Sequence, residues 1–132
     1  MDYFFFGSLR DTGVLSAVIG CADSERLPPR IRLEPGTLVN YRAHRVVDED
    51  YPLLVPFEDA AVPGLIVGGM TECEIDRIRF FEDAHYAPSK VTIQLADGRL
   101  SRSCLAFLSF DQSEDSGVPW NYDNWPVRDR RI

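Results

Sequence analysis

Two short stretches of this 132-residue chain carry groups that could do chemistry. In the first, four aromatic residues at positions 3–6 run directly into Gly7 and Ser8, and an apolar, helix-like run follows at 13–19. A buried strand that ends in a glycine turn before a helix can direct several backbone N–H groups to one point. Such donors suit a carboxylate or another oxygen-rich group of a ligand. The alternative interpretation is an ordinary tight turn at the end of a strand.

The second stretch is a predicted helix over residues 71–82 that ends on an acid. Ile75 and Ile78 define the core face of this helix, and Glu82 follows them by seven and four residues. Residues at these spacings share one side of a helix, so Glu82 is expected to point inward. Burial raises the pKa of a carboxyl group towards the value that a general base needs near neutral pH. If the helix frays near Phe80 instead, Glu82 is a solvated residue at a helix end.

The elements that must position these groups follow no regular β–α–β pattern. The helices are the two just described, and a T-x-x-E capping box at Thr71 marks the start of the second. Many short strands with two main helices indicate an α+β domain with a small, mostly antiparallel, barrel-like sheet. The predicted strands cover residues 3–6, 36–39, 45–47, 53–55, 64–68, 86–95 and 100–110.

Turn and loop signals separate the predicted strands. Asp97 followed by Gly98 is a strong hairpin signal, and a turn is expected at 59–61. The prolines within residues 21–35 indicate a connecting loop. The acidic run at 111–116 is interpreted as a solvated loop.

Length, charge and cysteine content narrow the class of protein. The chain fits one domain over residues 1–132, in which 111–132 form an aromatic and basic tail. No apolar run approaches the about 20 residues that span a bilayer and no signal peptide is evident, so a cytoplasmic protein is expected. The net charge of −7 disfavours nucleic acid as a partner. Reduced thiols and no metal site are expected from the widely spaced cysteines, which are Cys21, Cys73 and Cys104.

Four segments, in their order and spacing, resemble the AIG2-like branch of the γ-glutamylcyclotransferase superfamily. The loop at residues 6–10 (FGSLR) is similar to the family's YGTLR or YGSL loop, and segment 78–86 is similar to its L-D-x-F-E…Y segment. Between them, YPLLVP at 51–56 and VPGLIV at 62–67 resemble the family's YPALVP stretch and V-x-G-x-apolar strand. The resemblance covers residues 3–108.

The resemblance implies a barrel-like α+β fold with a cavity between the first loop and the second helix. In the family, the backbone N–H groups of the loop hold the α-carboxylate end of a γ-glutamyl substrate. A glutamate that corresponds to Glu82 takes a proton from the α-amino group, and the freed amine attacks the γ-carbonyl of the same molecule. The products are 5-oxoproline and a released amine or amino acid, and no metal or organic cofactor is needed. The substrate-binding loop residues implied here are Phe6, Gly7, Ser8 and Leu9.

Two tyrosines are further candidates for substrate binding. Tyr51 is the first residue of the YPLLVP stretch. Its side chain could line the pocket or pack in the core. Tyr86 follows Glu82 by four residues. It could bond the substrate, orient Glu82, or simply be an aromatic core residue of a strand.

Departures from the family pattern bear on the substrate. The family's loop tyrosine is Phe6 here, and its aspartate three residues before the glutamate is Arg79. The tryptophan that follows the loop in the glutathione-degrading branch is absent, which argues against glutathione as the specific substrate. A second hypothesis is therefore kept, in which the same fold holds a small carboxylate without turnover. In both cases the partner is a small molecule, and the chain is a monomer or a homodimer.

The histidines and tryptophans are not expected to take part in chemistry. His44 and His85 are expected at the surface, because a lone histidine near a loop is more often exposed than catalytic. Trp120 and Trp125 would bury large areas, so the tail is expected to pack on the domain or on a partner subunit.

Overall fold

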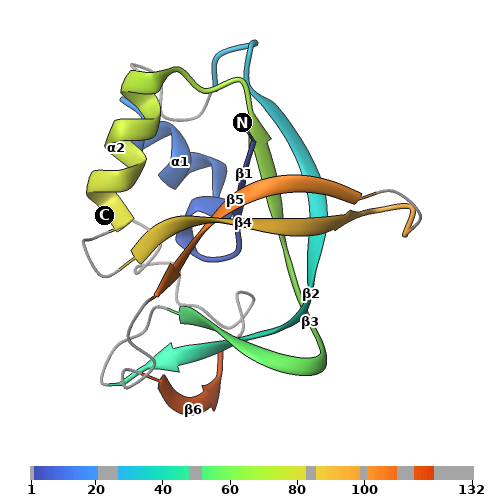
Figure 1. Cartoon of the computed structure of the whole chain (residues 1–132). Coiled ribbons are helices and arrows are strands. Elements are labelled where there is room, and N and C mark those ends of the chain that lie inside the picture. The colour runs from blue at the N-terminus through green and yellow to red at the C-terminus, as the bar shows by residue number, and fades with distance from the viewer. Residues whose placement is uncertain are drawn as a thin grey trace.

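The structure, a computed structural model, describes residues 2–20, 27–47, 52–82, 86–98, 101–109 and 115–120. The strands in this part of the chain are β1 (Tyr3–Phe5), β2 (Arg32–Val46), β3 (Pro52–Gly68), β4 (Tyr86–Leu95), β5 (Ser101–Ser109) and β6 (Asp115–Pro119). They form one sheet in the order β3-β1-β5-β4-β2-β6, and a further pairing of β2 with β3 closes the first five into a barrel (Figure 1). Only β1 and β5 pair in parallel among these strands. The expected α+β fold with a mostly antiparallel, barrel-like sheet is confirmed.

Strands β2 and β3 are both longer than the sequence predicts. The turn expected at 59–61 is wrong, because β3 continues through these residues. Asn40 on β2 and Asp59 on β3 take positive φ angles of 65° and 63°, and the pairing register shifts between Val39 and Tyr41. The Asp59 N–H donates to Oδ1 of Asn40 at 3.3 Å. Asn and Asp tolerate this backbone conformation, so the chain bends at an irregularity in the ladder where a turn was expected.

β2 also begins earlier than expected, within the predicted loop at 21–35. Residues 32–35 belong to the strand, and Pro35 lies opposite Leu65 of β3. The proline is tolerated because β4 pairs with β2 only from Gly36 onward, so no N–H is needed towards that neighbour. The strands predicted separately within β2 and β3 are therefore parts of two continuous strands.

Both α-helices lie on the same side of the barrel (Figure 1). A short 3₁₀ helix, η1 (Ser8–Arg10), leads into α1 (Thr12–Val18), and α2 (Glu72–Glu82) follows β3. Asp11 caps α1, because its Oδ1 accepts hydrogen bonds from the N–H groups of Gly13 at 2.9 Å and Val14 at 3.2 Å. Both predicted helices are confirmed, with each end within one residue of the expected position.

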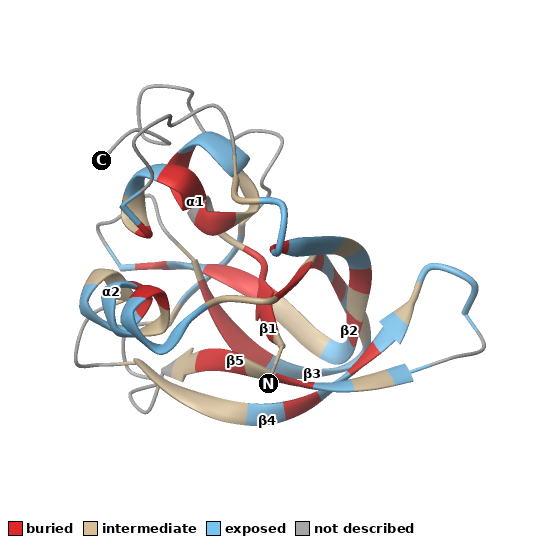
Figure 2. Ribbon diagram, turned by 90° about the horizontal axis from the view of Figure 1, so that it is seen from above, coloured by how far each residue is buried: buried red, intermediate tan, exposed pale blue. Residues whose placement is uncertain are grey.

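The aromatic run in β1 and its flank supplies both apolar layers of the domain. Phe4 and Phe6 join the cluster that fills the barrel, whereas Tyr3 and Phe5 join a second cluster that includes residues of both helices. Successive strand residues point to opposite faces, so a single run of aromatics can serve both layers. The Tyr3 ring stacks on Phe107 of β5 with centroids 5.9 Å apart. Figure 2 shows the buried residues gathered in the sheet and on the parts of the helices next to it.

His44 is buried, so the surface position expected for it is wrong. It is 5% exposed, and its Nδ1 lies 2.8 Å from Oδ1 of Asp115. Its Nε2 accepts a hydrogen bond from Nε of Arg42 at 2.6 Å, which leaves Nδ1–H as the donor to Asp115. Asp115 begins β6, which pairs with the end of β2. The solvated loop expected at 111–116 is therefore wrong from Asp115 onward, because that carboxylate has a buried partner.

Part of the predicted tail packs on the barrel. Trp120 lies against the barrel cluster, and its backbone N–H donates to the carbonyl of Ala43 at 2.9 Å. The packing expected for the tail is confirmed for this residue, whereas Trp125 and His85 lie outside the described residues.

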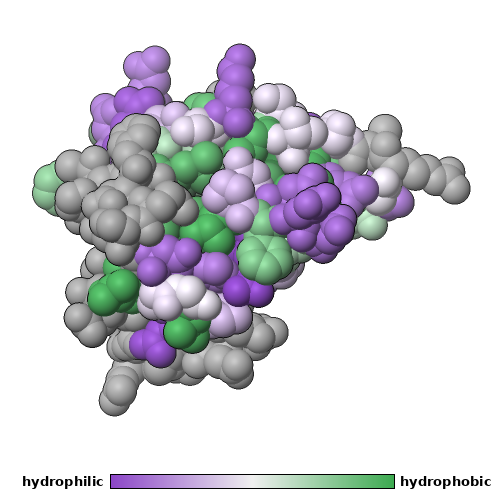
Figure 3. Space-filling view, turned by 60° about the horizontal axis from the view of Figure 1, so that its bottom comes forward, coloured by the Kyte–Doolittle hydropathy of each residue, from purple (hydrophilic) through white to green (hydrophobic). Residues whose placement is uncertain are grey.

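The exposed hydrophobic side chains form no single large patch on the face shown in Figure 3, where they are scattered among polar ones. Within the described ranges, no helix is both long enough and apolar enough to cross a membrane. The large hydrophobic residues exposed on the described surface are Leu33, Val39, Val47, Phe57, Phe80 and Val118.

Candidate active site

The glycine loop is anchored in both apolar layers. Phe6, before the glycine, is 8% exposed and packs in the barrel cluster, while Leu9, after it, is 1% exposed and packs among the helices. The two side chains that flank Gly7 and Ser8 are thus buried in the core and do not face a ligand. What the loop can offer to a ligand is therefore mainly its backbone.

The start of η1 leaves backbone donors available. The N–H of Arg10 bonds to the carbonyl of Gly7 at 3.0 Å, which closes the first 3₁₀ turn. Within the described chain, the N–H groups of Ser8 and Leu9 donate to no backbone carbonyl. The first N–H groups of any helix lack internal acceptors. These two donors are consistent with the predicted site for an oxygen-rich ligand group.

Gly7 lies against the start of β3. A Cβ atom at Gly7 would be 3.4 Å from Cγ of Pro52, which is ordinary van der Waals contact. The carbonyl of Pro52 accepts a hydrogen bond from the Tyr86 hydroxyl at 3.5 Å. The structure therefore brings the loop and Tyr86 to the same residue. Tyr51 precedes Pro52 but lies outside the described residues, as does the side chain of Ser8.

Tyr86 is the first residue of β4 and joins two packing clusters. It contacts the cluster that contains Leu9 and Ile78, and also a small cluster around Leu53. Phe81, the neighbour of Glu82, packs against the same helix-layer cluster. The glycine loop, the end of α2 and the start of β4 thus each contribute side chains to one apolar cluster.

Glu82 is the last residue of α2, which does not fray at Phe80. Its side chain is partly buried, and burial raises the pKa of the carboxyl from its ordinary value of 4.5 to about 7. Among the described residues, no hydrogen bond or ion pair to this carboxyl is found. A carboxyl with that pKa can accept and release a proton near neutral pH.

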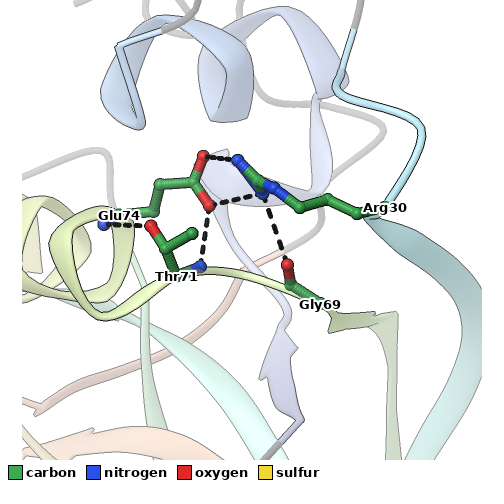
Figure 4. Close-up of polar contacts among 4 residues, drawn as sticks. All are labelled: Arg30, Gly69, Thr71 and Glu74. Atoms are coloured by element: carbon green, nitrogen blue, oxygen red, sulfur yellow. Dashed lines mark hydrogen bonds and ion pairs between the residues drawn. The ribbon is translucent and has the colours of Figure 1, made fainter.

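The other end of α2 holds a carboxylate with many partners (Figure 4). Oε1 of Glu74 accepts the N–H of Thr71 at 2.8 Å, and the Glu74 N–H donates to Oγ1 of Thr71 at 3.2 Å, which confirms the predicted capping box. Arg30 adds a two-point contact to the same carboxylate, at 2.8 and 2.7 Å. Arg30 was not predicted as a partner of Glu74, because no local sequence pattern indicates a contact between residues 44 positions apart.

No metal centre is evident in the described residues, since they contain no group of three or more His, Cys, Asp or Glu side chains that could hold an ion. The chemistry available from the described groups is proton transfer by Glu82 and hydrogen bonding by the loop backbone. The loop donors suit an oxygen-rich group of a ligand, and the Glu82 carboxyl suits proton exchange with an ionisable group.

Comparison with known proteins shows which family this chain is similar to. A family model for gamma-glutamyl cyclotransferase, AIG2-like, matches residues 3–127. Protein AIG2 A of Arabidopsis thaliana is 21% identical over 126 residues, which cover 94% of this chain and 69% of that protein. A solution structure of an Arabidopsis thaliana protein gives a TM-score of 0.71 at 23% identity, covering 94% of this chain and 78% of that one. A solved gamma-glutamyl cyclotransferase gives a TM-score of 0.64 at 12% identity, covering 84% and 67%.

Proposed function

The chain belongs to the AIG2-like γ-glutamyl cyclotransferase family, and from this premise we propose that it converts a γ-glutamyl amine or γ-glutamyl amino acid to 5-oxoproline and a free amine. The observation that carries the proposal is Glu82, a partly buried carboxyl whose pKa is raised by burial to about 7. Such a group is both an acceptor and a donor of protons near neutral pH. The proposed reaction needs one group that does both.

In the proposed reaction, the Glu82 carboxylate takes a proton from the α-ammonium group of the substrate. The freed nitrogen attacks the γ-carbonyl carbon, a five-membered ring closes, and the bond from that carbon to the leaving nitrogen breaks. Glu82 returns the proton to the leaving nitrogen as that bond breaks, and the second proton of the attacking nitrogen passes by the same carboxylate to the released amine, which leaves as an ammonium ion. No water is consumed. Because the nucleophile belongs to the substrate, no Ser, Cys or Lys nucleophile is required. Ring closure within one molecule depends mainly on holding the attack geometry.

The glycine loop is the proposed binding site for the α-carboxylate of the substrate. The backbone N–H groups of Ser8 and Leu9, which donate to no backbone carbonyl in the described chain, support this role. The buried side chains of Phe6 and Leu9 hold the loop on both sides, so its donors are preorganised. Tyr86, whose hydroxyl donates to the carbonyl of Pro52, is proposed to border the substrate. The same role is proposed for Tyr51, the residue before Pro52.

One departure from the family pattern carries little weight against this proposal. Arg79 is exposed and lies 3.9 Å from Asp76 on the outer side of α2, away from the buried Ile78. The replacement at this position therefore leaves the inner face of the helix unchanged. The replacement of the family's tyrosine by Phe6 has more consequence, because it removes a hydroxyl near the loop. Loss of this hydroxyl affects which γ-glutamyl compound the site can bind.

The proposed setting is the cytoplasm, with a small molecule as the partner and a monomer or homodimer as the active form. The described cysteines, Cys73 and Cys104, are free thiols, which agrees with a reducing compartment. The net charge of −7 weighs against nucleic acid as a partner.

Release of 5-oxoproline from a panel of γ-glutamyl amines and γ-glutamyl amino acids tests the function. We expect turnover of at least one compound, and none by Glu82→Gln under the same conditions. Undiminished turnover by Glu82→Gln would rule out the proposed base. Thermal stabilisation of the protein by a γ-glutamyl compound that is never converted would instead favour the non-catalytic binding module.

A further inference from the structure

We propose that Arg30 is a positioning residue that sets the rotation of α2 and thereby the place of Glu82, an inference that rests on the proposed role of Glu82 as the base. Arg30 lies just before β2, and its guanidinium meets Glu74 in the first turn of α2 (Figure 4). Glu82 lies eight residues further along the helix, about 12 Å away along its axis. Arg30 therefore acts on Glu82 only through the helix.

The inner side of α2 combines apolar packing with one directional polar contact. Glu74, Ile78 and Glu82 follow one another at intervals of four residues and so lie along one side of the helix. Ile78 is buried, and Ile75 and Phe81 are partly buried and pack against the same cluster. Apolar packing is non-directional, so it sets how closely the helix approaches the sheet more sharply than it sets the rotation of the helix about its axis. The buried Glu74 with Arg30 adds a directional contact that restrains this rotation.

This polar contact joins Arg30 both to α2 and to the segment that leads into the helix. The guanidinium of Arg30 contacts both oxygens of Glu74, and its Nη1 also donates to the carbonyl of Gly69 at 3.3 Å. Gly69 has a φ of 85°, and a Cβ atom there would collide with the carbonyl oxygen of Arg30. The backbone of Arg30 is thus packed directly on the segment that leads into α2. Planar two-point contacts of this kind fix orientation as well as distance.

A small roll of α2 would matter at Glu82. The carboxylate at the tip of a helix side chain lies about 6 Å from the helix axis, so a roll of about 20° moves it by about 2 Å. A misplacement of about 1 Å at a reacting group can lower a rate by about a hundredfold. The same movement would also change how far the Glu82 carboxyl is buried, and burial is what raises its pKa.

The substitution Arg30→Met tests the proposal, because it removes the two-point contact and keeps a long apolar side chain. We expect kcat for 5-oxoproline release to fall by about 10–100-fold with little change in KM. We also expect the pH–rate profile to shift to lower pH. Arg30→Lys, which keeps the charge but loses the planar two-point contact, should recover part of kcat. Arg32→Met is the matched control, since Arg32 is exposed and pairs with Asp2 at 3.7 Å.

A second measurement separates this proposal from the proposed function. NMR titration of isotope-labelled side-chain carboxyls reports the pKa of Glu82 without any turnover. We expect that pKa to be lower in Arg30→Met than in the unsubstituted protein and unchanged in Arg32→Met. An unchanged Glu82 pKa together with an unchanged kcat in folded Arg30→Met would overturn the positioning role. If no compound is turned over by the unsubstituted protein, the proposed function fails, while the Glu82 pKa still decides whether Arg30 sets the helix.

A third variant covers the case in which Arg30→Met does not fold. The double substitution Arg30→Met/Glu74→Met removes the carboxylate that would otherwise be left buried without its partner. The same kcat and pKa measurements apply to it, with the same expected directions. A double variant that folds and keeps both values of the unsubstituted protein would contradict the proposal.

Discussion

Glu74 and Glu82 are two glutamates on one side of one helix, yet their surroundings differ completely. Glu74 lies in the first turn of α2, and its carboxylate accepts hydrogen bonds from Arg30 and from the backbone of Thr71. Glu82 ends the helix, and no such partner is found for it among the described residues. Burial raises the pKa of Glu82 to about 7.

The difference shows how burial of a carboxylate can serve structure or chemistry. Where a buried carboxylate meets a guanidinium and a backbone donor, as at Glu74, the group joins segments of the chain. Where burial comes alone, the charged form is disfavoured, and the group becomes able to exchange a proton near neutral pH. The comparison predicts that substitution of Glu82 mainly affects turnover, whereas substitution of Glu74 mainly affects the stability of the fold.

The largest expected effect is on turnover at Glu82. Replacing this residue by glutamine keeps its size but removes the proton acceptor, so kcat should fall by about 10²–10⁴. Glu72→Gln is the matched control, since Glu72 is an exposed carboxylate on the same helix and should leave kcat near that of the unsubstituted protein. Initial rates of 5-oxoproline release measure both variants. Equal losses in the two would mean that net charge, and not the Glu82 carboxyl, is responsible.

The next effect is the pH dependence of the reaction. If ionised Glu82 is the base, kcat/KM should rise as pH increases through about 7, with about a tenfold change per unit well below that value. The direction follows because burial raises the pKa, so the carboxylate is scarce below pH 7. Measuring kcat/KM from pH 5 to pH 9 tests this. A profile that is already flat above pH 5 would show that Glu82 has an ordinary carboxyl pKa.

Stability should respond in opposite directions at the two glutamates. Glu82 binds its proton more tightly in the folded than in the unfolded chain, so its contribution to stability is lost as pH rises from 4.5 through about 7. At pH 8, Glu82→Gln should therefore raise the free energy of unfolding, by as much as about 3 kcal/mol. Glu74→Gln should lower it by about 1–3 kcal/mol, because a charge-assisted pair and a cap are weakened.

Urea unfolding at pH 8 and at pH 4 measures both variants. At pH 4 the gain from Glu82→Gln should vanish, because Glu82 is then protonated in the folded and the unfolded chain alike. Destabilisation by Glu82→Gln at pH 8 would indicate a partner for this carboxylate and would remove the contrast with Glu74.

The sequence was sufficient to predict α2 and the side on which Glu82 lies, because these depend on local spacing. The capping box that begins at Thr71 and the four-residue interval from Ile78 to Glu82 are both evident from the sequence of this segment alone. The partner of Glu74 was not predictable, since Arg30 comes from a segment 44 residues away. The contrast between the two glutamates therefore appears only in three dimensions.

The sheet was predicted in class but not in detail. Alternating short strands and the hairpin signal at Gly98 sufficed for a barrel-like, mostly antiparallel sheet. The continuity of β3 was missed because Asp59 usually signals a turn, whereas here it pairs with Asn40 at a bend in the ladder. His44 was misread for a similar reason, since its buried partner Asp115 is 71 residues away.

The smallest expected effect concerns the loop that faces the end of α2 in the proposed site. If the loop binds the substrate through its backbone, Ser8→Ala should change kcat/KM by no more than about threefold, which is under 1 kcal/mol of transition-state binding. Ser8→Pro is the informative contrast, because proline deletes the N–H at the first position of η1, where its ring is tolerated. We expect this variant to raise KM far more than Ser8→Ala does, at a similar melting temperature. A large loss in Ser8→Ala would instead give the hydroxyl a direct role, and Glu82 would no longer be the only side chain on which the chemistry depends.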